Sequence, residues 1–289
     1  MTAKKYFSRV YILQSLRKGD LKTGTNLEDL LQFLRFKVPQ LSCRLFEIAD
    51  KASFLLRLQD IEKDVLIEKQ YPIIHVDVHG DENGIKVSSG EVITWNELQP
   101  ILMSINIACC NNLFVVLAVC KGGNLLKVCY PPRRATVWGL IGSFQNFEAQ
   151  DADVSFQAFY KELLTSFDVN MALDQLNNAF PKMQPRYSFT TCMSMFIETF
   201  KKYHAEYCVG KRKKERIEVL ITKVMNAQYI QGGRSVTEVR NQAKSLSKKG
   251  KDDFEKQKER FFMIDLCPNN RERFLDLRYI DCVSHSESL

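Results

Sequence analysis

Short apolar runs alternate with amphipathic segments along the first 180 residues of this 289-residue chain. Residues 73–80 and 113–120 are rich in β-branched side chains and are bounded by Gly and Asn. That pattern is typical of buried parallel strands. Three similar runs occur elsewhere in this part of the chain. We therefore expect strands at 8–16, 41–48, 73–80, 113–120 and 135–142.

Amphipathic segments with helix-start signals lie between these runs. Thr25 with Glu28, and Thr94 with Glu97, have capping-box spacing, in which two side chains bond the free N–H groups of a first helical turn. The turn residues within 82–90 predict a small β-ribbon. We expect helices at about 25–36, 54–65, 94–110, 154–167 and 170–178. Strands that alternate with helices predict an α/β sandwich with a mostly parallel central sheet.

Pro181 and Pro185 indicate a domain boundary. Helical periodicity dominates beyond them, at 189–207, 214–229 and 236–260. We therefore predict an α/β domain over residues 1–180 and a mostly helical region over residues 181–289.

The basic charge of the chain is concentrated in its C-terminal part. The net charge is +7, and residues 211–260 hold fifteen Lys and Arg against seven Asp and Glu. Such a bias can attract nucleic acid or an acidic partner. The solvated faces of charged helices are the simpler account.

The composition is that of a soluble cytoplasmic protein. The chain has no run of roughly 18 apolar residues, the length that a membrane helix needs. Its first residues lack the apolar region of a signal peptide. The nine cysteines are odd in number and scattered, which favours reduced thiols over a disulfide framework. We expect no membrane association.

A histidine and a cysteine close two of the predicted strands. His79 and Gly80 end the 73–80 strand, and Cys120 ends the 113–120 strand. Ligands of open α/β sheets gather at the carboxyl ends of the strands, and a right-handed crossover would make these two strands neighbours. An imidazole can take the proton of a thiol, and the N–H groups of Gly80 and Cys120 could stabilise an oxyanion. The sequence thus predicts a nucleophilic Cys/His pair.

The other residues that could take part in catalysis or metal binding do not suggest a second site. His75 lies well below the end of its strand and is interpreted as structural, whereas Asp77 shares the side of His79 and could orient it. His204 and Cys208 supply only half a zinc site, and no nucleotide-binding motif is present. We therefore expect neither a metal nor another cofactor.

The order of strand, His79 and Gly80, then strand and Cys120 about forty residues later, resembles the caspase-like cysteine peptidases, the clan of caspases, separase and gingipains. The ribbon after Gly80, residues 118–123 (Ala-Val-Cys-Lys-Gly-Gly) and residues 138–143 are most similar to bacterial CHAT-domain proteases. The resemblance covers roughly residues 6–178. It implies a caspase-like α/β/α sandwich in which His79 is the general base and Cys120 the nucleophile.

The resemblance also implies a function. It suggests an endopeptidase that cleaves a protein or peptide after a basic P1 residue, under the control of an activating protein partner in a bacterial antiviral defence system. Glu148, Asp151 and Asp153 are candidates for binding the basic side chain. Ordinary solvation of a charged loop is the other account of these three acids.

Two alternatives remain open. The family has a small residue directly before the cysteine, whereas this chain has Val119. The chain could therefore be a catalytically inactive caspase-like binding module. It could also be a nucleic-acid-binding protein that uses residues 211–260, although no base-reading motif is visible there and direct nucleic-acid binding is not what we expect.

Overall fold

The structure is a computed structural model, and it describes residues 7, 9–39, 41–69, 71–129, 133–179, 186–207, 214–215, 217–219, 221–223, 226, 235, 237–241 and 250–283. The chain divides into two compact units. The first contains Met1–Tyr130 and Arg134–Cys192, and the second contains Pro131–Arg133 and Met193–Leu289. The expected boundary after residue 180 lies before the last strand of the first unit.

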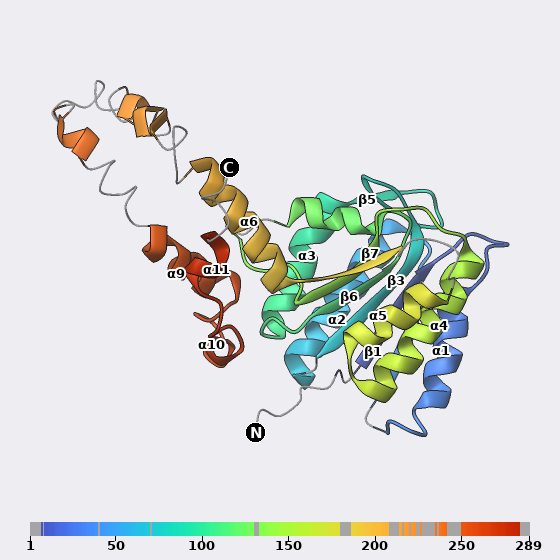
Figure 1. Cartoon of the computed structure of the whole chain (residues 1–289). Coiled ribbons are helices and arrows are strands. Elements are labelled where there is room, and N and C mark those ends of the chain that lie inside the picture. The colour runs from blue at the N-terminus through green and yellow to red at the C-terminus, as the bar shows by residue number, and fades with distance from the viewer. Residues whose placement is uncertain are drawn as a thin grey trace. The chain divides into compact units, whose positions relative to one another are not determined.

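A central β-sheet forms the middle layer of the first unit (Figure 1). Its strands are β1 (Arg9–Ser15), β2 (Ser42–Glu47), β3 (Pro72–Gly80), β6 (Phe114–Ala118), β7 (Gly139–Ser143) and β8 (Tyr187–Thr191). The spatial order is β2-β1-β3-β6-β7-β8, and only β8 runs antiparallel to its neighbour. The first unit is thus an α/β fold with a mostly parallel mixed sheet, as the alternation of strands and helices predicts.

Helices cover both faces of this sheet (Figure 1). One face carries α1 (Thr23–Leu34), α4 (Ala149–Ser166) and α5 (Val169–Asn178), and the other carries α2 (Lys51–Glu68) and α3 (Trp95–Ala108). Side chains alternate between the two faces along a strand. The core beneath α1, α4 and α5 is accordingly built from every second strand residue, including Val10, Ile12, Ile73, Phe114, Val116 and Ala118.

The predicted ribbon is present directly after β3. The strands β4 (Gly84–Lys86) and β5 (Val92–Thr94) pair with each other, and β4 also pairs with the end of β3. The capping box of Thr94 and Glu97 is confirmed, because the backbone N–H of Glu97 donates to Thr94 Oγ1 (3.3 Å) and the N–H of Thr94 donates to Glu97 Oε2 (2.9 Å).

The other predicted capping box is wrong. Helix α1 begins at Thr23, with Lys22 before it, and neither Thr25 nor Glu28 caps its first turn. The N–H of Thr25 donates to Gln14 of β1 (3.1 Å), and Glu28 accepts from the N–H of Leu45 in β2 (3.3 Å). Contacts with neighbouring strands have replaced the local pairing.

The strand and helix predictions also fail around β7 and β8. The β7 strand begins at Gly139, four residues after the expected start at 135. The helix expected from residue 189 begins at Cys192, because residues 187–191 form β8. This segment pairs with all five residues of β7, and tertiary pairing of this kind overrides a local helical pattern.

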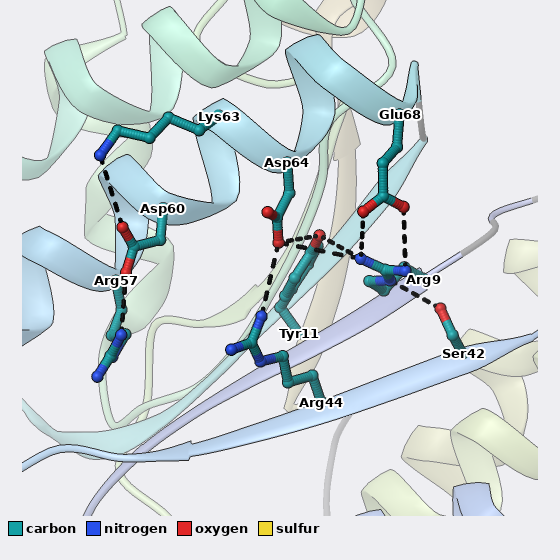
Figure 2. Close-up of polar contacts among 9 residues, drawn as sticks. All are labelled: Arg9, Tyr11, Ser42, Arg44, Arg57, Asp60, Lys63, Asp64 and Glu68. Atoms are coloured by element: carbon teal, nitrogen blue, oxygen red, sulfur yellow. Dashed lines mark hydrogen bonds and ion pairs between the residues drawn. The ribbon is translucent and has the colours of Figure 1, made fainter.

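A polar network holds α2 against the starts of β1 and β2 (Figure 2). Arg9 pairs with Glu68 (3.1 Å), and the Tyr11 hydroxyl donates to Asp64 (3.2 Å). Arg44 approaches the same Asp64 carboxylate (3.8 Å). These charges satisfy one another at the amino ends of the strands, so we interpret the network as structural.

The described helices of the second unit are α6 (Cys192–Tyr207), α9 (Gly250–Phe261), α10 (Asn270–Arg273) and α11 (Tyr279–Val283). Aromatic rings form their common core: Phe196, Phe200, Phe254, Phe261, Phe262 and Phe274. The structure describes the basic segment 211–260 and the helices expected at 214–229 and 236–260 only in part, and Cys208 lies outside the described residues. No described helix has the length and apolar character needed to cross a membrane.

Candidate active site

His79 lies near the end of β3, on the face covered by α1 and α4. The same face contains Ile73, which belongs to the core beneath these helices, and side chains two, four and six residues further share it. The His79 side chain is about half exposed (47%), in contrast with the buried residues before it. The strand therefore brings this imidazole out of the core to the edge of the sheet.

Cys120 occupies the corresponding position after β6. Phe114, Val116 and Ala118 face α1 and α4, and Cys120 follows β6 by two residues in a turn. The backbone N–H of Phe147 donates to Cys120 Sγ (3.5 Å), and the thiol is within donating distance of the Phe147 carbonyl (3.6 Å). The partly buried sulfur is thus held by the loop after β7.

The strand register brings His79 and Cys120 to the same edge. The β3 and β6 strands are adjacent and parallel, and Asp77 pairs with Ala118. His79 and Cys120 each follow this pair by two residues, so the register brings both to the carboxyl edge of the sheet. The Cys/His pair itself stays a prediction.

Gly80 is required by close packing between these two strand ends. A Cβ atom at Gly80 would lie 2.3 Å from Val119 Cγ1 and 3.2 Å from the Cys120 carbonyl oxygen. Gly80 is not among the residues with a left-handed backbone, so space and not unusual φ explains the glycine. Val119, which departs from the family pattern, is accommodated by the missing side chain of Gly80. The oxyanion role of the Gly80 and Cys120 N–H groups stays a prediction.

Asp20 is a site residue that the sequence reasoning missed. It follows Gly19, which has a left-handed φ of 97°, in the loop after β1. Asp20 Oδ2 lies 2.8 Å from His79 Nε2 and also accepts from the N–H of Arg17 (2.8 Å). The hydrogen bond with His79 is the largest cause of the lowered pKa of Asp20. An ionised carboxylate accepts the Nε2 proton, which leaves His79 Nδ1 free to exchange a proton with a thiol.

Asp77 bonds the start of α1 and not the imidazole, although it shares the face of His79. Its carboxylate accepts from the Thr23 hydroxyl (2.6 Å) and the Gly24 N–H (2.7 Å) at the start of α1. Burial raises the pKa of Asp77 to about 6. The role proposed for Asp77, orienting the histidine, is therefore taken by Asp20 in this structure.

The raised pKa of Asp77 makes stability depend on pH. Between about pH 4 and 6, Asp77 is ionised in the unfolded chain but still protonated in the folded protein. As the pH rises through this range, the folded protein therefore loses about 3 kcal/mol of stability relative to the unfolded chain. Asp77→Asn cannot ionise and escapes this loss. We expect urea unfolding to show the variant gaining up to about 3 kcal/mol on wild type between pH 4 and pH 7. A difference in unfolding free energy that does not change with pH would contradict this account.

His75 is structural, as its position on the strand predicts. Its ring packs edge-on against Phe156 and Tyr160, and its Nδ1 lies 3.3 Å from the Tyr160 hydroxyl. Complete burial lowers the pKa of His75 to about 3. The residue is neutral and has no path to a substrate.

The three acids proposed for substrate binding have different surroundings. Asp151 forms an ion pair with Arg186, so its charge is neutralised. Asp153 accepts from the side-chain amides of Asn26 and Gln157 (both 3.1 Å). Glu148 precedes α4 and its side chain makes no capping hydrogen bond. The structure therefore leaves Glu148 and Asp153, but not Asp151, with charge that no described cation neutralises.

An exposed ion pair joins the loops that follow the two predicted catalytic residues. Lys121 pairs with Glu82, which raises the pKa of the lysine and lowers that of the glutamate. Lys121 directly follows Cys120 and has a left-handed backbone (φ 58°). The N–H of Lys121 donates to the Gln145 carbonyl (3.0 Å), which fixes the exit from β6 next to the β7 loop.

A groove lies away from the predicted site residues. In the second unit, residues between Glu255 and Ile280 line a groove of about 730 Å³ that contains none of the predicted site residues. No group of three or more His, Cys, Asp or Glu side chains within the described residues could hold a metal ion. His204 Nε2 instead lies 3.0 Å from the Tyr279 hydroxyl.

The redox state of the cysteines differs in part from the expectation of reduced thiols. Among the described residues, six cysteines are free thiols: Cys43, Cys109, Cys120, Cys129, Cys192 and Cys282. Cys110 and Cys267 are disulfide-bonded, so the expectation of reduced thiols is wrong for these two. Burial raises the pKa values of Cys43, Cys129 and Cys282 to about 12, 11 and 11, which disfavours their thiolates.

Comparison with known proteins gives no assignment for the chain. No protein-family model matches it, and no curated protein is significantly similar to it in sequence.

Proposed function

We propose that this protein is a caspase-like cysteine endopeptidase in which Cys120 attacks the peptide carbonyl and His79 is the general base. The observation that supports the proposal is the register of β3 and β6, in which His79 and Cys120 each follow the Asp77–Ala118 pair by two residues at the carboxyl edge of the sheet. Asp20 adds a third member, bonded to the far nitrogen of the imidazole.

The proposed reaction begins with proton transfer from the Cys120 thiol to His79 Nδ1. The thiolate forms a bond to the carbonyl carbon, and the carbonyl oxygen takes up negative charge near the N–H groups of Gly80 and Cys120. His79 then protonates the departing amine as the peptide C–N bond breaks. Water, deprotonated by His79, hydrolyses the thioester and restores the Cys120 thiol.

Asp20 acts on this reaction through His79. Its hydrogen bond fixes Nε2 as the protonated nitrogen and stabilises the imidazolium that forms when Nδ1 accepts the thiol proton. Because Asp20 is partly exposed (30%), we expect a smaller contribution than from a fully buried carboxylate.

A basic P1 residue remains the proposed specificity, on the strength of the resemblance to CHAT-domain proteases. Glu148 and Asp153 could supply the negative charge, since Asp151 is paired with Arg186. The same resemblance supports an activating protein partner and a place in a bacterial defence system. Both belong to the proposal and extend beyond the geometry of the site.

Labelling with a peptidyl acyloxymethyl ketone carrying P1 Arg tests the proposal. Mass spectrometry would locate the adduct on wild type and on His79→Ala at neutral pH. We expect label on Cys120 that disappears in His79→Ala, with the five other free thiols as internal controls. Label spread over several cysteines regardless of His79 would reject the pair and favour an inactive binding module.

A further inference from the structure

The Tyr187 hydroxyl lacks a hydrogen-bond partner. Among the buried side-chain nitrogen and oxygen atoms of the described residues, it is the one atom without a partner. Tyr187 is 4% exposed, so water does not reach the hydroxyl freely. A buried hydroxyl without a partner destabilises a protein, and phenylalanine would fill the same space without this cost. The hydroxyl therefore needs an explanation.

Tyr187 lies on the Cys120 side of the sheet. It begins β8 opposite Ser143, the last residue of β7. Its ring packs against Phe147 (5.4 Å between ring centroids), and the backbone of Phe147 contacts Cys120 Sγ through both its N–H and its carbonyl group. Phe147 thus contacts both the Tyr187 ring and the proposed nucleophile.

The charged groups around Tyr187 limit the choice of acceptor to which its hydroxyl could donate a hydrogen bond. Cys120, Arg186 and Asp151 act electrostatically on its hydroxyl. Arg186 and Asp151 already pair with each other. Lys121, which directly follows Cys120, is bonded to Glu82, and His79 is bonded to Asp20. Cys120 is therefore the group near Tyr187 whose need for a donor changes when it ionises.

We propose that the Tyr187 hydroxyl is a hydrogen-bond donor for the Cys120 thiolate. A neutral thiol is a weak acceptor, and here its own proton lies toward the Phe147 carbonyl. Loss of that proton creates a strong acceptor that the Phe147 N–H already contacts. The Tyr187 hydroxyl, on which Cys120 already acts electrostatically, would then be a second donor to the sulfur. This inference rests on the proposed function, since it assigns a residue that supports the same nucleophile.

The pH dependence of Cys120 alkylation by iodoacetamide, followed by mass spectrometry, tests this role. Losing one donor to the thiolate should raise the Cys120 pKa by about one unit in Tyr187→Phe and slow alkylation about tenfold at acidic pH. Tyr160→Phe is the matched control, since its hydroxyl bonds His75 in the same core. It should leave the Cys120 pKa unchanged. An unchanged pKa in folded Tyr187→Phe would overturn the proposal.

Thermal unfolding supplies a second readout. Tyr187→Phe removes a hydroxyl without a partner and should melt at a higher temperature than wild type, whereas Tyr160→Phe loses a bonded hydroxyl and should melt lower. If Tyr187→Phe fails to fold, wild type labelled with ¹³C at tyrosine Cζ replaces it. The Tyr187 signal should then shift with the ionisation of Cys120 and stay constant in Cys120→Ala, and a constant signal in wild type would also reject the proposal.

The proposed function and this inference can fail separately. A Cys120 pKa that rises in Tyr187→Phe, in a protein that no P1 Arg reagent labels, would retain the inference and remove the protease assignment. Label on Cys120 with an unchanged pKa in Tyr187→Phe would do the opposite.

Discussion

Cys120→Ala is expected to lower peptide cleavage by at least about 10⁴-fold while leaving the fold intact, because the nucleophile is lost and binding energy alone remains. Cleavage of a P1 Arg peptide library, read by mass spectrometry, measures the effect. Cys129→Ala is the matched control. Cys129 is also a partly buried free thiol, its sulfur donates to the Leu125 carbonyl (3.4 Å), and it should be dispensable for cleavage.

Asp20→Asn should lower cleavage in the same assay by less than Cys120→Ala does. The amide retains the size of the side chain but disfavours the His79 tautomer that carries its proton on Nε2, so we expect a loss of about 10²-fold in kcat with little change in KM. Unchanged cleavage in Cys120→Ala would reject the protease proposal. Unchanged cleavage in Asp20→Asn alone would restrict the mechanism to a Cys/His pair.

Gly80→Ala is expected to destabilise the first unit by about 1–3 kcal/mol, the usual cost of overpacking. The new Cβ would meet Val119 Cγ1 at 2.3 Å, the Gly84 carbonyl oxygen at 3.1 Å and the Cys120 carbonyl oxygen at 3.2 Å. The Val119 side chain is fully buried and the other two atoms belong to the backbone, so none can move freely. Urea unfolding measures the effect, and Cys120 labelling should fall at the same time because the strand ends separate.

A double-mutant cycle tests whether the clash with Val119 causes the destabilisation in Gly80→Ala. Val119→Ala removes the atom in the worst clash, so Gly80→Ala should cost less in that background than in wild type. Strictly additive effects would show that Gly80 is required for a reason other than its contact with Val119.

The sequence predicts most of the scaffold because its strands are local and strongly patterned. The apolar runs of β1, β3 and β6 predict these strands close to their observed ends, since burial on both faces requires apolar side chains throughout. The edge strand β2 is also predicted close to its observed ends. The β8 strand is different. Its five residues, Tyr-Ser-Phe-Thr-Thr, become a strand because the edge of β7 is open to pairing, and no local signal records that edge.

In the candidate site, too, some residues can be predicted from local sequence and one cannot. His79 and Cys120 are recognisable because each closes an apolar run of the sequence, and the pairing of β3 with β6 brings both to the carboxyl edge of the sheet. Asp20 follows a strand too, after Gly19, but a Gly-Asp pair in a polar loop looks like an ordinary turn. Its contact with His79 exists because β1 lies beside β3 in the sheet.

The sequence by itself determines the α/β alternation, the positions of His79 and Cys120 at the ends of apolar runs and the ribbon that follows Gly80, because each depends on periodicity or turn chemistry within a few residues. Tertiary structure alone decides which charges are satisfied and which are not. Arg186 neutralises Asp151 across 35 residues, Thr23 and Gly24 engage Asp77, and the Tyr187 hydroxyl is left without a partner. These outcomes depend on long-range packing, which brings together groups that have no fixed relation along the chain.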